Sequence, residues 1–576
     1  MADAVRFTAP GPGAWELETT HYNQPVTRFF QQAMLDGFAK GFAASTARYG
    51  VMLSHLEPGF ANGFTYMRAV GFGAPANAMG PPPKPIVQVL TRLLPSMRKR
   101  IQAGHDAFMD KRWRQDMARW DGEVKPAAIT RHLHLQSVDL SLLDDAALAQ
   151  HVRDAYRHLA AMIEQHHDFT LTVAVPIGDF LAHVQQWTNL PAGQILQALR
   201  GSTRISLGVA QDELAAVAAV VRSNPELRAL LGGPGPANMI VEALLAHGAS
   251  AFAMKAYLDL MRWRCLGYDL GSKSVGEMPE LVVRSIQAAL DGAGGQRDDA
   301  NAARARIQAL RQSVPAEHQV AFDVLVDEVR FVNRLRDERG HFSDGWAVGL
   351  ARRALGEAGR RLVQRGVFTG ADAAYDATRD EIVDLLEGRP GPSEAELQAR
   401  AAWRASKTTA DPDIPPWLGA PPTPPPPADW LPPNGRRTAR AVEAFLTTMF
   451  IEPAARSTDT SVRGLPVSPG VYEGTARVVN DEAEFGRIER GDVLVARSTS
   501  PYFNVVLPLL GAIVTDRGGQ LCHAAIVARE YGVPGVVGTR DACKVIPDGA
   551  RVRVDGGTGE VTVLAWHPRD RPKALL

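Results

Sequence analysis

The stretch TDRGGQLCHAAIVAREYGVPGVVGT, residues 515–539, changes from a strand-like pattern to a helical pattern at a single histidine. Gly518 and Gly519 can adopt backbone conformations that are open to few other residues, so the chain can turn sharply after the strand. A helix is predicted to begin near His523 and to end at Gly532. The segment therefore predicts a strand, a tight turn and a helix with a histidine at its start.

The position of His523 gives its ring a specific chemistry. The positive end of a helix dipole disfavours the imidazolium form, so one ring nitrogen keeps a free lone pair. The same field and the free N–H groups of the first helical turn favour a phosphate group on or near the ring. We interpret His523 as a candidate phosphoryl carrier. The alternative is a histidine that only caps or packs at the helix start.

The two parts of the chain on either side of residue 411 differ in pattern. From about residue 31 to residue 400 apolar residues recur at helical spacing, and helices are predicted over residues 147–167, 321–339 and 350–366. From residue 464 short β-rich runs such as TARVVN, DVLVARS and GAIVTD are separated by Gly, Pro and Asp. We expect a multidomain chain, with a large, predominantly α-helical domain over residues 1–410 and a compact β/α domain over residues 464–576.

The segment between these domains is rich in proline. In residues 411–434, DPDIPPWLGAPPTPPPPADWLPPN, eleven of 24 residues are Pro, which favours an extended polyproline conformation. A short connecting helix and a polar, flexible joint are predicted over residues 435–463. The Pro-rich linker is either a passive spacer or a semi-rigid arm that sets how far the next domain can travel.

Composition excludes several classes of protein. Lys plus Arg and Asp plus Glu both number 63, so the formal charge is zero, which argues against a protein that mainly grips nucleic acid. The three cysteines are far apart and form neither a disulfide framework nor a C-x-x-C metal pattern. No secretory leader and no apolar run long enough to span a bilayer is apparent, so we expect a cytoplasmic protein that does not bind membranes.

The string GG-x-x-x-HAAIVARE-x-G-x-PGVVG resembles the phosphohistidine motif of the PEP-utilising enzymes, where PEP is phosphoenolpyruvate. The segments GLPVSPGVYEGTARVV, DVLVARSTSPYF and DGARVRVDGGTGEVTVL are similar to other parts of that family's swivelling domain. The resemblance implies that His523 is phosphorylated and that Gly518, Gly519 and Cys522 shape the phosphate site. Cys522 departs from the family, which usually has Ser or Thr before the histidine, and a thiol is a weaker helix cap.

Three segments of the helical domain resemble the substrate domains of rifampin phosphotransferase and of the His-bearing subunit of phenylphosphate synthase. They are ELETTHYNQPVTRFF (residues 16–30), YLDLMRWRCLGYDLGSKSVGEMPELV (257–282) and LRDERGHFSDGWAVGLARRAL (335–355). The resemblance implies transfer of the phosphoryl group to the hydroxyl of a small apolar or aromatic molecule. The aromatic-rich residues 60–73 are expected either to wall an apolar acceptor pocket or to belong to the ordinary core.

No segment resembles the ATP-grasp domain that loads this family's histidine, and no G-x-x-x-x-G-K-[ST] loop is present. We therefore expect no tightly bound cofactor and a separate ATP-grasp partner subunit that holds ATP and Mg²⁺. The isolated chain should not turn over ATP. Two alternatives stay open: a non-catalytic or regulatory protein, and a carrier loaded from PEP by another chain.

The acceptor site needs cations for the phosphoryl oxygens and a base for the hydroxyl. In RDERGH, Arg336 and Arg339 share a helix face, and Asp337 lies four residues before His341, so the carboxylate could orient that imidazole unless Gly340 breaks the helix. A solvated helix end is the alternative. His21 and His166 are further candidates, and a structural or surface histidine is the alternative for each. Arg264 is a candidate because it lies in a segment that resembles the family's substrate domain. No histidine and carboxylate spacing reproduces a known metal site, so we expect no metal.

Overall fold

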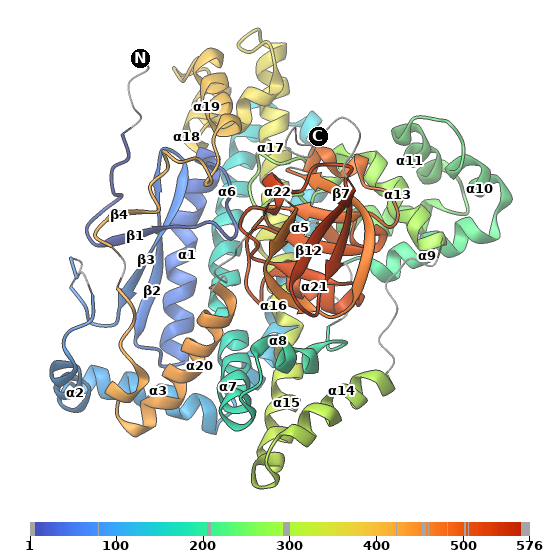
Figure 1. Ribbon diagram of the computed structural model, residues 1–576. Coiled ribbons are helices and arrows are strands. Elements are labelled where there is room, and N and C mark those ends of the chain that lie inside the picture. The colour runs from blue at the N-terminus through green and yellow to red at the C-terminus, as the bar shows by residue number, and fades with distance from the viewer. Residues whose placement is uncertain are drawn as a thin grey trace. The chain divides into compact units, whose positions relative to one another are not determined.

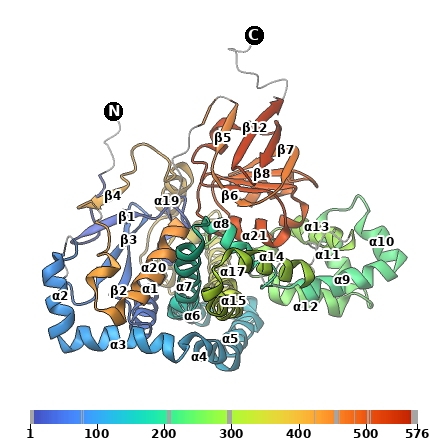
Figure 2. The same ribbon diagram turned by 60° about the horizontal axis from the view of Figure 1, so that its bottom comes forward.

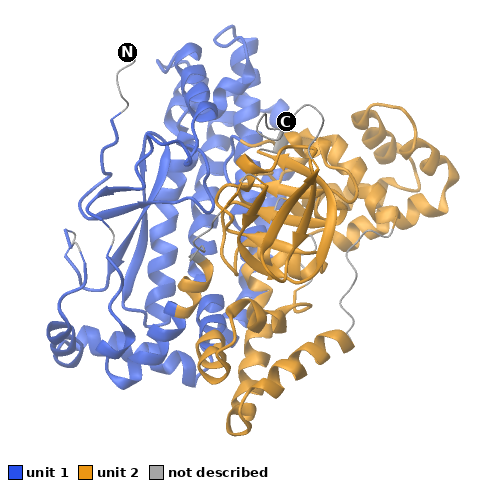
Figure 3. Cartoon of the chain, viewed as in Figure 1, with its two compact units in different colours: residues 1–179, 268–271, 338–443 blue, residues 180–267, 272–337, 444–576 orange. Residues whose placement is uncertain are grey.

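The computed structural model describes residues 6–565 except residues 76, 79, 204–208, 292–299, 422, 451–456, 459, 481, 500–502 and 505. The chain forms two compact units (Figure 3). Unit 1 comprises residues 1–179, 268–271 and 338–443, and unit 2 comprises residues 180–267, 272–337 and 444–576. Each unit is therefore assembled from three separate stretches of the chain, whereas the sequence pattern predicts four consecutive segments.

Unit 1 is built mainly of helices (Figure 1). They are α1 Arg28–Arg48, α2 Lys84–Leu93, α3 Pro95–Met109, α4 Arg112–Arg119, α5 Lys125–Ser137, α6 Asp145–Asp168, α17 Asp344–Gln364, α18 Arg379–Leu386 and α19 Glu394–Ser406. Helices α1 and α6 pack so closely that a Cβ atom on Gly37 would lie 2.2 Å from the carbonyl oxygen of Ala160. The predicted helices over residues 147–167 and 350–366 are confirmed as α6 and α17.

Unit 1 also contains a four-stranded sheet, which the helical pattern did not predict. Its strands are β1 Ala14–Leu17, β2 Leu53–Ala61, β3 Phe64–Gly71 and β4 Trp417–Gly419, in the order β2-β3-β1-β4. Strands β2 and β3 form an antiparallel hairpin whose turn residues, Asn62 and Gly63, have φ of 51° and 86°. Such paired positive φ angles are typical of tight hairpin turns. Residues 60–73 thus belong to this hairpin, and Phe64 and Tyr66 are buried in the core beneath the sheet.

The Pro-rich segment is not a free linker along its whole length. Strand β4 pairs with β1, with Leu418 opposite Trp15, and the N–H of Leu17 donates to the carbonyl oxygen of Pro416 at 2.9 Å. The hydroxyl of Tyr66 donates to the carbonyl oxygen of Pro415 at 2.9 Å. Residues 415–419 are therefore anchored in unit 1, where β4 is an edge strand, a position that tolerates nearby proline because one side of the strand needs no pairing.

Three helices run from one unit into the other: α7 Thr170–Thr188, α16 Leu335–His341 and α20 Pro433–Phe450. The helix predicted over residues 321–339 is two helices, because α15 ends at Asn333 and α16 begins at Leu335. The remaining helices of the first part of unit 2 are α8 Ala192–Ile195, α9 Gln211–Ser223, α10 Pro225–Leu231, α11 Ala237–Ala246, α12 Ala251–Met261, α13 Pro279–Leu290, α14 Ala300–Ser313 and α15 Gln319–Asn333.

The C-terminal part of unit 2 is the expected β/α domain. Its strands are β5 Ser461–Arg463, β6 Leu465–Ser468, β7 Val471–Val479, β8 Val493–Ala496, β9 Ala512–Thr515, β10 Gly535–Val537, β11 Arg551–Asp555 and β12 Glu560–Ala565. They form one sheet in the order β5-β12-β11-β7-β8-β9-β10-β6, in which β7, β8, β9 and β10 are parallel neighbours.

Two helices, α21 His523–Tyr531 and α22 Ala542–Val545, complete this domain. Helix α21 lies at the base of the fanned strands in Figure 2 and packs on β6, β9 and β10. The overall fold is thus a large helical region followed by a compact β-rich domain, as expected. Among the helices that the structure describes, none is both long and apolar enough to cross a membrane.

Candidate functional site

The turn before α21 depends on both of its glycines. Gly518 has φ +118°, and a Cβ atom there would lie 2.6 Å from the sulfur of Cys522. A Cβ atom on Gly519 would lie 2.3 Å from the carbonyl oxygen of Met449. The N–H of Gln520 donates to the carbonyl oxygen of Thr448 at 3.0 Å. The first glycine therefore supplies an unusual backbone angle, and the second lets the end of α20 approach.

Helix α21 begins where the sequence predicts. Cys522 is its N-cap residue, with φ −69° and ψ 163°, and makes no side-chain cap hydrogen bond. Burial raises the pKa of its thiol, so the thiol stays neutral and unreactive. The helix ends at Gly532, which has φ +68°. Cys522 thus acts as a small buried residue at the start of the helix.

Both ring nitrogens of His523 have neighbours within hydrogen-bonding distance. The hydroxyl oxygen of Thr499 lies 2.9 Å from Nδ1, and Oδ1 of Asn504 lies 3.2 Å from Nε2. The ring is half-buried. Burial, reinforced by the positive charge of Arg336, lowers the pKa of His523 to about 3. The ring is therefore neutral at physiological pH, as a nucleophilic nitrogen requires.

Arg336 is the predicted phosphate ligand that lies beside this histidine. It extends from α16, and its Nη1 donates to the carbonyl oxygen of Leu521 at 3.4 Å. The side chain is 9% exposed, and its Nε lies 3.9 Å from Oδ1 of Asp337, which is too far for a hydrogen bond. Burial lowers the pKa of Arg336 below its usual value. Its charge is nevertheless retained, because an arginine remains protonated far above neutral pH.

Arg529 and Glu530, on the last turns of α21, have structural partners. Nη2 of Arg529 donates to the carbonyl oxygen of Gln520 at 2.7 Å, which ties the helix to the glycine turn. A carboxylate oxygen of Glu530 accepts from the N–H of Gly201 at 2.9 Å. Burial raises the pKa of Glu530 to about 7. These contacts fix the helix within unit 2.

Unit 1 brings together three other predicted residues: Arg339, His166 and His21. Nη1 of Arg339 donates to the carbonyl oxygen of His166 at 3.1 Å and to the hydroxyl of Thr170 at 2.9 Å. Nδ1 of His166 lies 2.7 Å from a carboxylate oxygen of Asp344, at the start of α17. Burial lowers the pKa of His166, with the charge of Arg339 acting in the same direction and Asp344 opposing it.

His21 belongs to the same cluster. Its Nδ1 lies 3.1 Å from Oε1 of Glu18, whose other oxygen accepts from the backbone N–H of His21 at 2.9 Å. Burial acts to lower the pKa of His21, but the negative charge and hydrogen bond of Glu18 outweigh it, so the pKa is raised. The ring of Tyr268 meets the His21 ring edge-on at 5.5 Å and the Tyr22 ring at 6.0 Å. The cluster thus combines titratable and aromatic side chains.

The other predicted residues have different surroundings. Arg264 is buried, and its Nε donates to the carbonyl oxygen of Leu260, four residues earlier, at 2.6 Å. Asp337 and His341 are both buried, and α16 continues through Gly340. Asp337 belongs to unit 2 and His341 to unit 1. The residues of the expected RDERGH site are thus divided between the two units.

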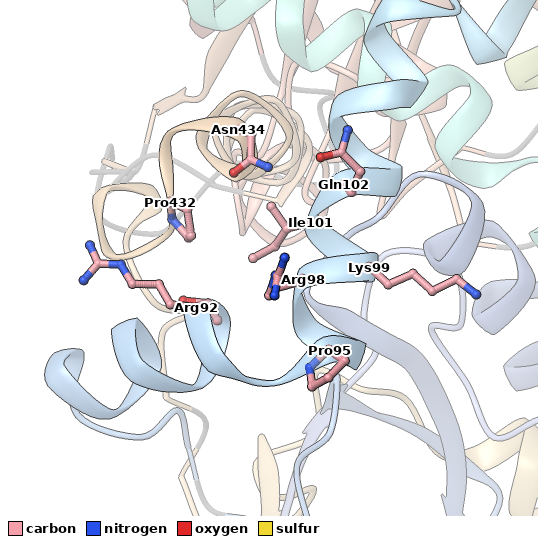
Figure 4. A pocket seen from close by; sticks show the side chains of 9 residues that line it. Arg92, Pro95, Arg98, Lys99, Ile101, Gln102, Pro432 and Asn434 are labelled. Atoms are coloured by element: carbon pink, nitrogen blue, oxygen red, sulfur yellow. The ribbon is translucent and has the colours of Figure 1, made fainter.

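A surface cavity of about 660 Å³ in unit 1 contains none of the predicted residues (Figure 4). It lies between α2, α3 and the start of α20, and it is lined by Thr91, Arg92, Pro95, Arg98, Lys99, Ile101, Gln102, Pro432 and Asn434. No cluster of three or more histidine, cysteine or acidic side chains suited to a metal ion occurs in the described part of the chain.

Two known protein families match parts of the chain that include residues described above. Residues 488–559 match the mobile domain of PEP-utilising enzymes and include His523. Residues 171–337 match the fourth domain of rifampicin phosphotransferase and include Arg336. The resemblance to PEP-utilising enzymes is confirmed over these residues.

Individual relatives agree with these matches. The chain is 28% identical over 383 residues to a rifampicin phosphotransferase of Streptomyces sviceus, covering 63% of this chain and 40% of the relative. It is 44% identical over 115 residues to a probable phosphoenolpyruvate synthase of Archaeoglobus fulgidus, covering 20% and 15%. It is 28% identical over 231 residues to an uncharacterized phosphotransferase of Bacillus subtilis, covering 40% and 26%. The chain spans less than half the length of each of these relatives.

Proposed function

We propose that this chain is the His-bearing component of a phosphotransferase. His523 accepts the β-phosphoryl group of ATP in a reaction that releases AMP and inorganic phosphate, and it passes the group to the hydroxyl of a small apolar or aromatic molecule. The observation that carries this proposal is the neutral, half-buried ring of His523 at the N-terminus of α21, beside the guanidinium of Arg336.

The proposed chemistry follows from three features of the carrier site. The neutral ring offers a lone pair for attack on phosphorus, because its pKa of about 3 keeps it unprotonated. The N-terminus of α21 and the charge of Arg336 stabilise negative charge on the phosphoryl oxygens. Phosphoryl transfer depends mainly on such positioning and charge stabilisation. A mobile domain could then carry the group between a loading and an unloading site.

We place the acceptor hydroxyl at the cluster around His166 in unit 1. Asp344 can hold the imidazole of His166 in one orientation, so that the opposite ring nitrogen removes the hydroxyl proton. Arg339 supplies a cation next to that ring. The aromatic rings of Tyr22 and Tyr268 favour an aromatic or apolar acceptor, because such rings pack well against flat apolar groups.

The proposed partner is a separate ATP-grasp subunit that binds ATP and Mg²⁺, in the manner of a two-component phenylphosphate synthase. The complex would operate in the cytoplasm. The exchange of the carrier between partner and acceptor sites would require the chain that connects the two domains to move. The Pro-rich arm is held in unit 1 at β4, Trp417–Gly419, and the predicted joint over residues 451–456 lies outside the described residues.

The experiment separates the two half-reactions. The full chain is mixed with a candidate ATP-grasp protein and ATP labelled at the β position, and a panel of phenols and alcohols is then added. We expect His166→Ala to acquire label on the protein at the wild-type rate but to release it to acceptor at least about 100-fold more slowly, since general-base catalysis contributes at least that factor. His105→Ala, an exposed histidine of the same unit, is the matched control. Undiminished transfer by His166→Ala contradicts the proposed acceptor site.

The alternatives make different predictions in the same assay. A carrier loaded from PEP acquires label from labelled PEP and a barrel-containing partner, and acquires none from ATP. A regulatory protein acquires label that no small hydroxyl compound removes.

A further inference from the structure

We propose that Asn504 is the residue that retains the phosphoryl group on Nε2 of His523, by turning its side-chain amide when the ring is phosphorylated. This inference rests on the proposed carrier function and assigns a role to a residue that lies 19 positions before the histidine.

The two neighbours of the ring differ in whether they can donate or only accept a hydrogen bond. The hydroxyl of Thr499 can either donate to Nδ1 or accept from it, so it suits both neutral tautomers. Oδ1 of Asn504 can only accept, and therefore its position 3.2 Å from Nε2 places the proton of the resting ring on Nε2. In that tautomer Thr499 donates to Nδ1. In the resting geometry Nε2, which faces Asn504, is therefore protonated and has no free lone pair.

Two donors beside this ring lack a hydrogen-bond partner among the described residues: Nδ2 of Asn504 and Nε of Arg336. Both side chains are deeply buried, with Asn504 9% exposed as a residue and the Arg336 side chain 9% exposed. Buried donors are almost always paired in native proteins, and an exception needs an explanation. An oxyanion at the N-terminus of the nine-residue helix α21 would accept from both.

The proposed step conserves protons and electrons. The ring proton moves by exchange with solvent from Nε2 to Nδ1, and Nδ1–H then donates a hydrogen bond to the oxygen of Thr499. The lone pair of Nε2 then forms the N–P bond while the bond from phosphorus to the donor's leaving oxygen or nitrogen breaks, and that electron pair departs with the leaving group. The amide of Asn504 turns by half a rotation, which a terminal amide torsion allows, and its Nδ2–H donates to a phosphoryl oxygen.

Asn504 and Arg336 differ in when they can act. Asn504 and Thr499 belong to the same domain as His523, so they stay beside the ring wherever that domain travels. Arg336 lies on α16 and contacts the glycine turn through Leu521. We infer that Asn504 protects the phosphorylated ring during transit, whereas Arg336 acts only where the carrier meets α16.

The test uses the full chain phosphorylated chemically with potassium phosphoramidate, which needs no partner protein. The ³¹P NMR resonance that His523→Ala lacks reports His523, and its shift distinguishes Nε2 from Nδ1 phosphorylation. We expect an Nε2 adduct in the wild type. Asn504→Asp keeps the acceptor oxygen but replaces the donor by a repelling carboxylate, so its adduct should hydrolyse at least about tenfold faster.

A matched control makes the same change elsewhere. Asn480→Asp, at an exposed position of the same domain, should leave the lifetime unchanged. If Asn504→Asp does not fold, Asn504→Ala replaces it. ¹⁵N NMR of the unphosphorylated ring adds a readout that a structural role would not move: Nε2–H should dominate in the wild type and lose that dominance in Asn504→Ala.

Each outcome is decisive. A folded Asn504 variant whose adduct lasts as long as that of the wild type overturns the role of Asn504, and so does an adduct on Nδ1. Absence of any His523-dependent resonance in the wild type contradicts the carrier function itself, and the role of Asn504 fails with it. The failure of the inference alone is therefore distinguishable from the failure of the proposed function.

Discussion

The hydroxyl oxygen of Thr499 lies 2.9 Å from Nδ1 of His523, although the two residues are 24 positions apart in the chain. Thr499 follows β8, His523 follows β9, and these strands are parallel neighbours in the sheet. Parallel strands end at the same edge of a sheet, and this edge is where open α/β sheets place their binding sites. The topology of the sheet thus pairs the histidine with the side chain that orients it.

The first prediction concerns the titration of His523. Its pKa is lowered from 6.5 to about 3, first by burial and then by the charge of Arg336, so the ring should stay neutral from pH 8 down to pH 5. NMR of the ring, assigned by comparison with His523→Ala, should show no titration over this range. A midpoint near pH 6.5 would contradict the burial and charge described for this site.

Glu530 should make the free energy of unfolding fall as the pH rises. Its pKa is raised from 4.5 to about 7, so the folded chain holds a proton that the unfolded chain has lost, and the stabilisation is lost as the pH rises through 7. Relative to Glu530→Gln, the wild type should lose about 2 kcal/mol between pH 5 and pH 8. Urea unfolding of both proteins measures this difference, and a difference independent of pH would refute it.

Gly519 should not tolerate a side chain. A Cβ atom there would lie 2.3 Å from the carbonyl oxygen of Met449, so Gly519→Ala must displace either the turn or the end of α20. We expect a loss of about 1–3 kcal/mol. Gly486→Ala is the matched control, because a Cβ atom there meets nothing within 4 Å, and it should change stability by about 0.5 kcal/mol or less. Equal thermal shifts for both variants would show that the close approach does not exist.

Anchoring of the Pro-rich segment can be tested at two adjacent residues of β4. Leu418 is 7% exposed and packs with Trp15 and Tyr66, so Leu418→Ala should cost about 2–5 kcal/mol. Trp417 is 47% exposed, and Trp417→Ala should cost about 0.5 kcal/mol or less. Chemical denaturation gives both values. Full stability in Leu418→Ala would mean that the segment is a free linker after all.

The β/α domain was predictable because its signals are local. Short β-type runs and the glycines around them mark the strands, and seven of the eight strands of the described sheet lie within residues 464–576. The eighth, β5, lies in the segment that was predicted as a flexible joint. The start of α21 followed from the glycine pair and the helical spacing after His523, and its end followed from Gly532. These features depend on nearby residues, and therefore no tertiary contact was needed to find them.

The sheet of unit 1 was missed for a physical reason. Apolar residues occupy much of β2 and β3 without strict alternation, so the period of two that marks a half-buried strand is weak. The usable signal was the pair Asn62 and Gly63, which suits a two-residue hairpin turn. Strand β4 could not be found from its own residues, because its pairing partner lies about 400 positions earlier in the chain.

The site was predictable only in part for the same reason. The sequence around His523 marks this residue by itself. Thr499 and Asn504 lie beside the His523 ring, and Asp344 beside the His166 ring, only because the fold brings them there. Arg336 and Arg339 were chosen as a pair on one helix face, but Arg336 contacts the turn before His523 and Arg339 contacts His166. Spacing along a helix cannot reveal which unit each side chain faces.

Identification of the residue that carries the phosphoryl group tests the central claim most directly. The full chain, His523→Ala and His523→Asn are incubated with a candidate ATP-grasp protein and ATP labelled at the β position, and the labelled protein is then exposed to acid or base. Asn retains a side chain of similar polarity and is a good helix cap, but it has no nucleophilic nitrogen. We predict that only the wild type acquires label and that the adduct is labile in acid and stable in base. Label on the Asn variant, or an adduct that survives acid, would place the carrier at another residue.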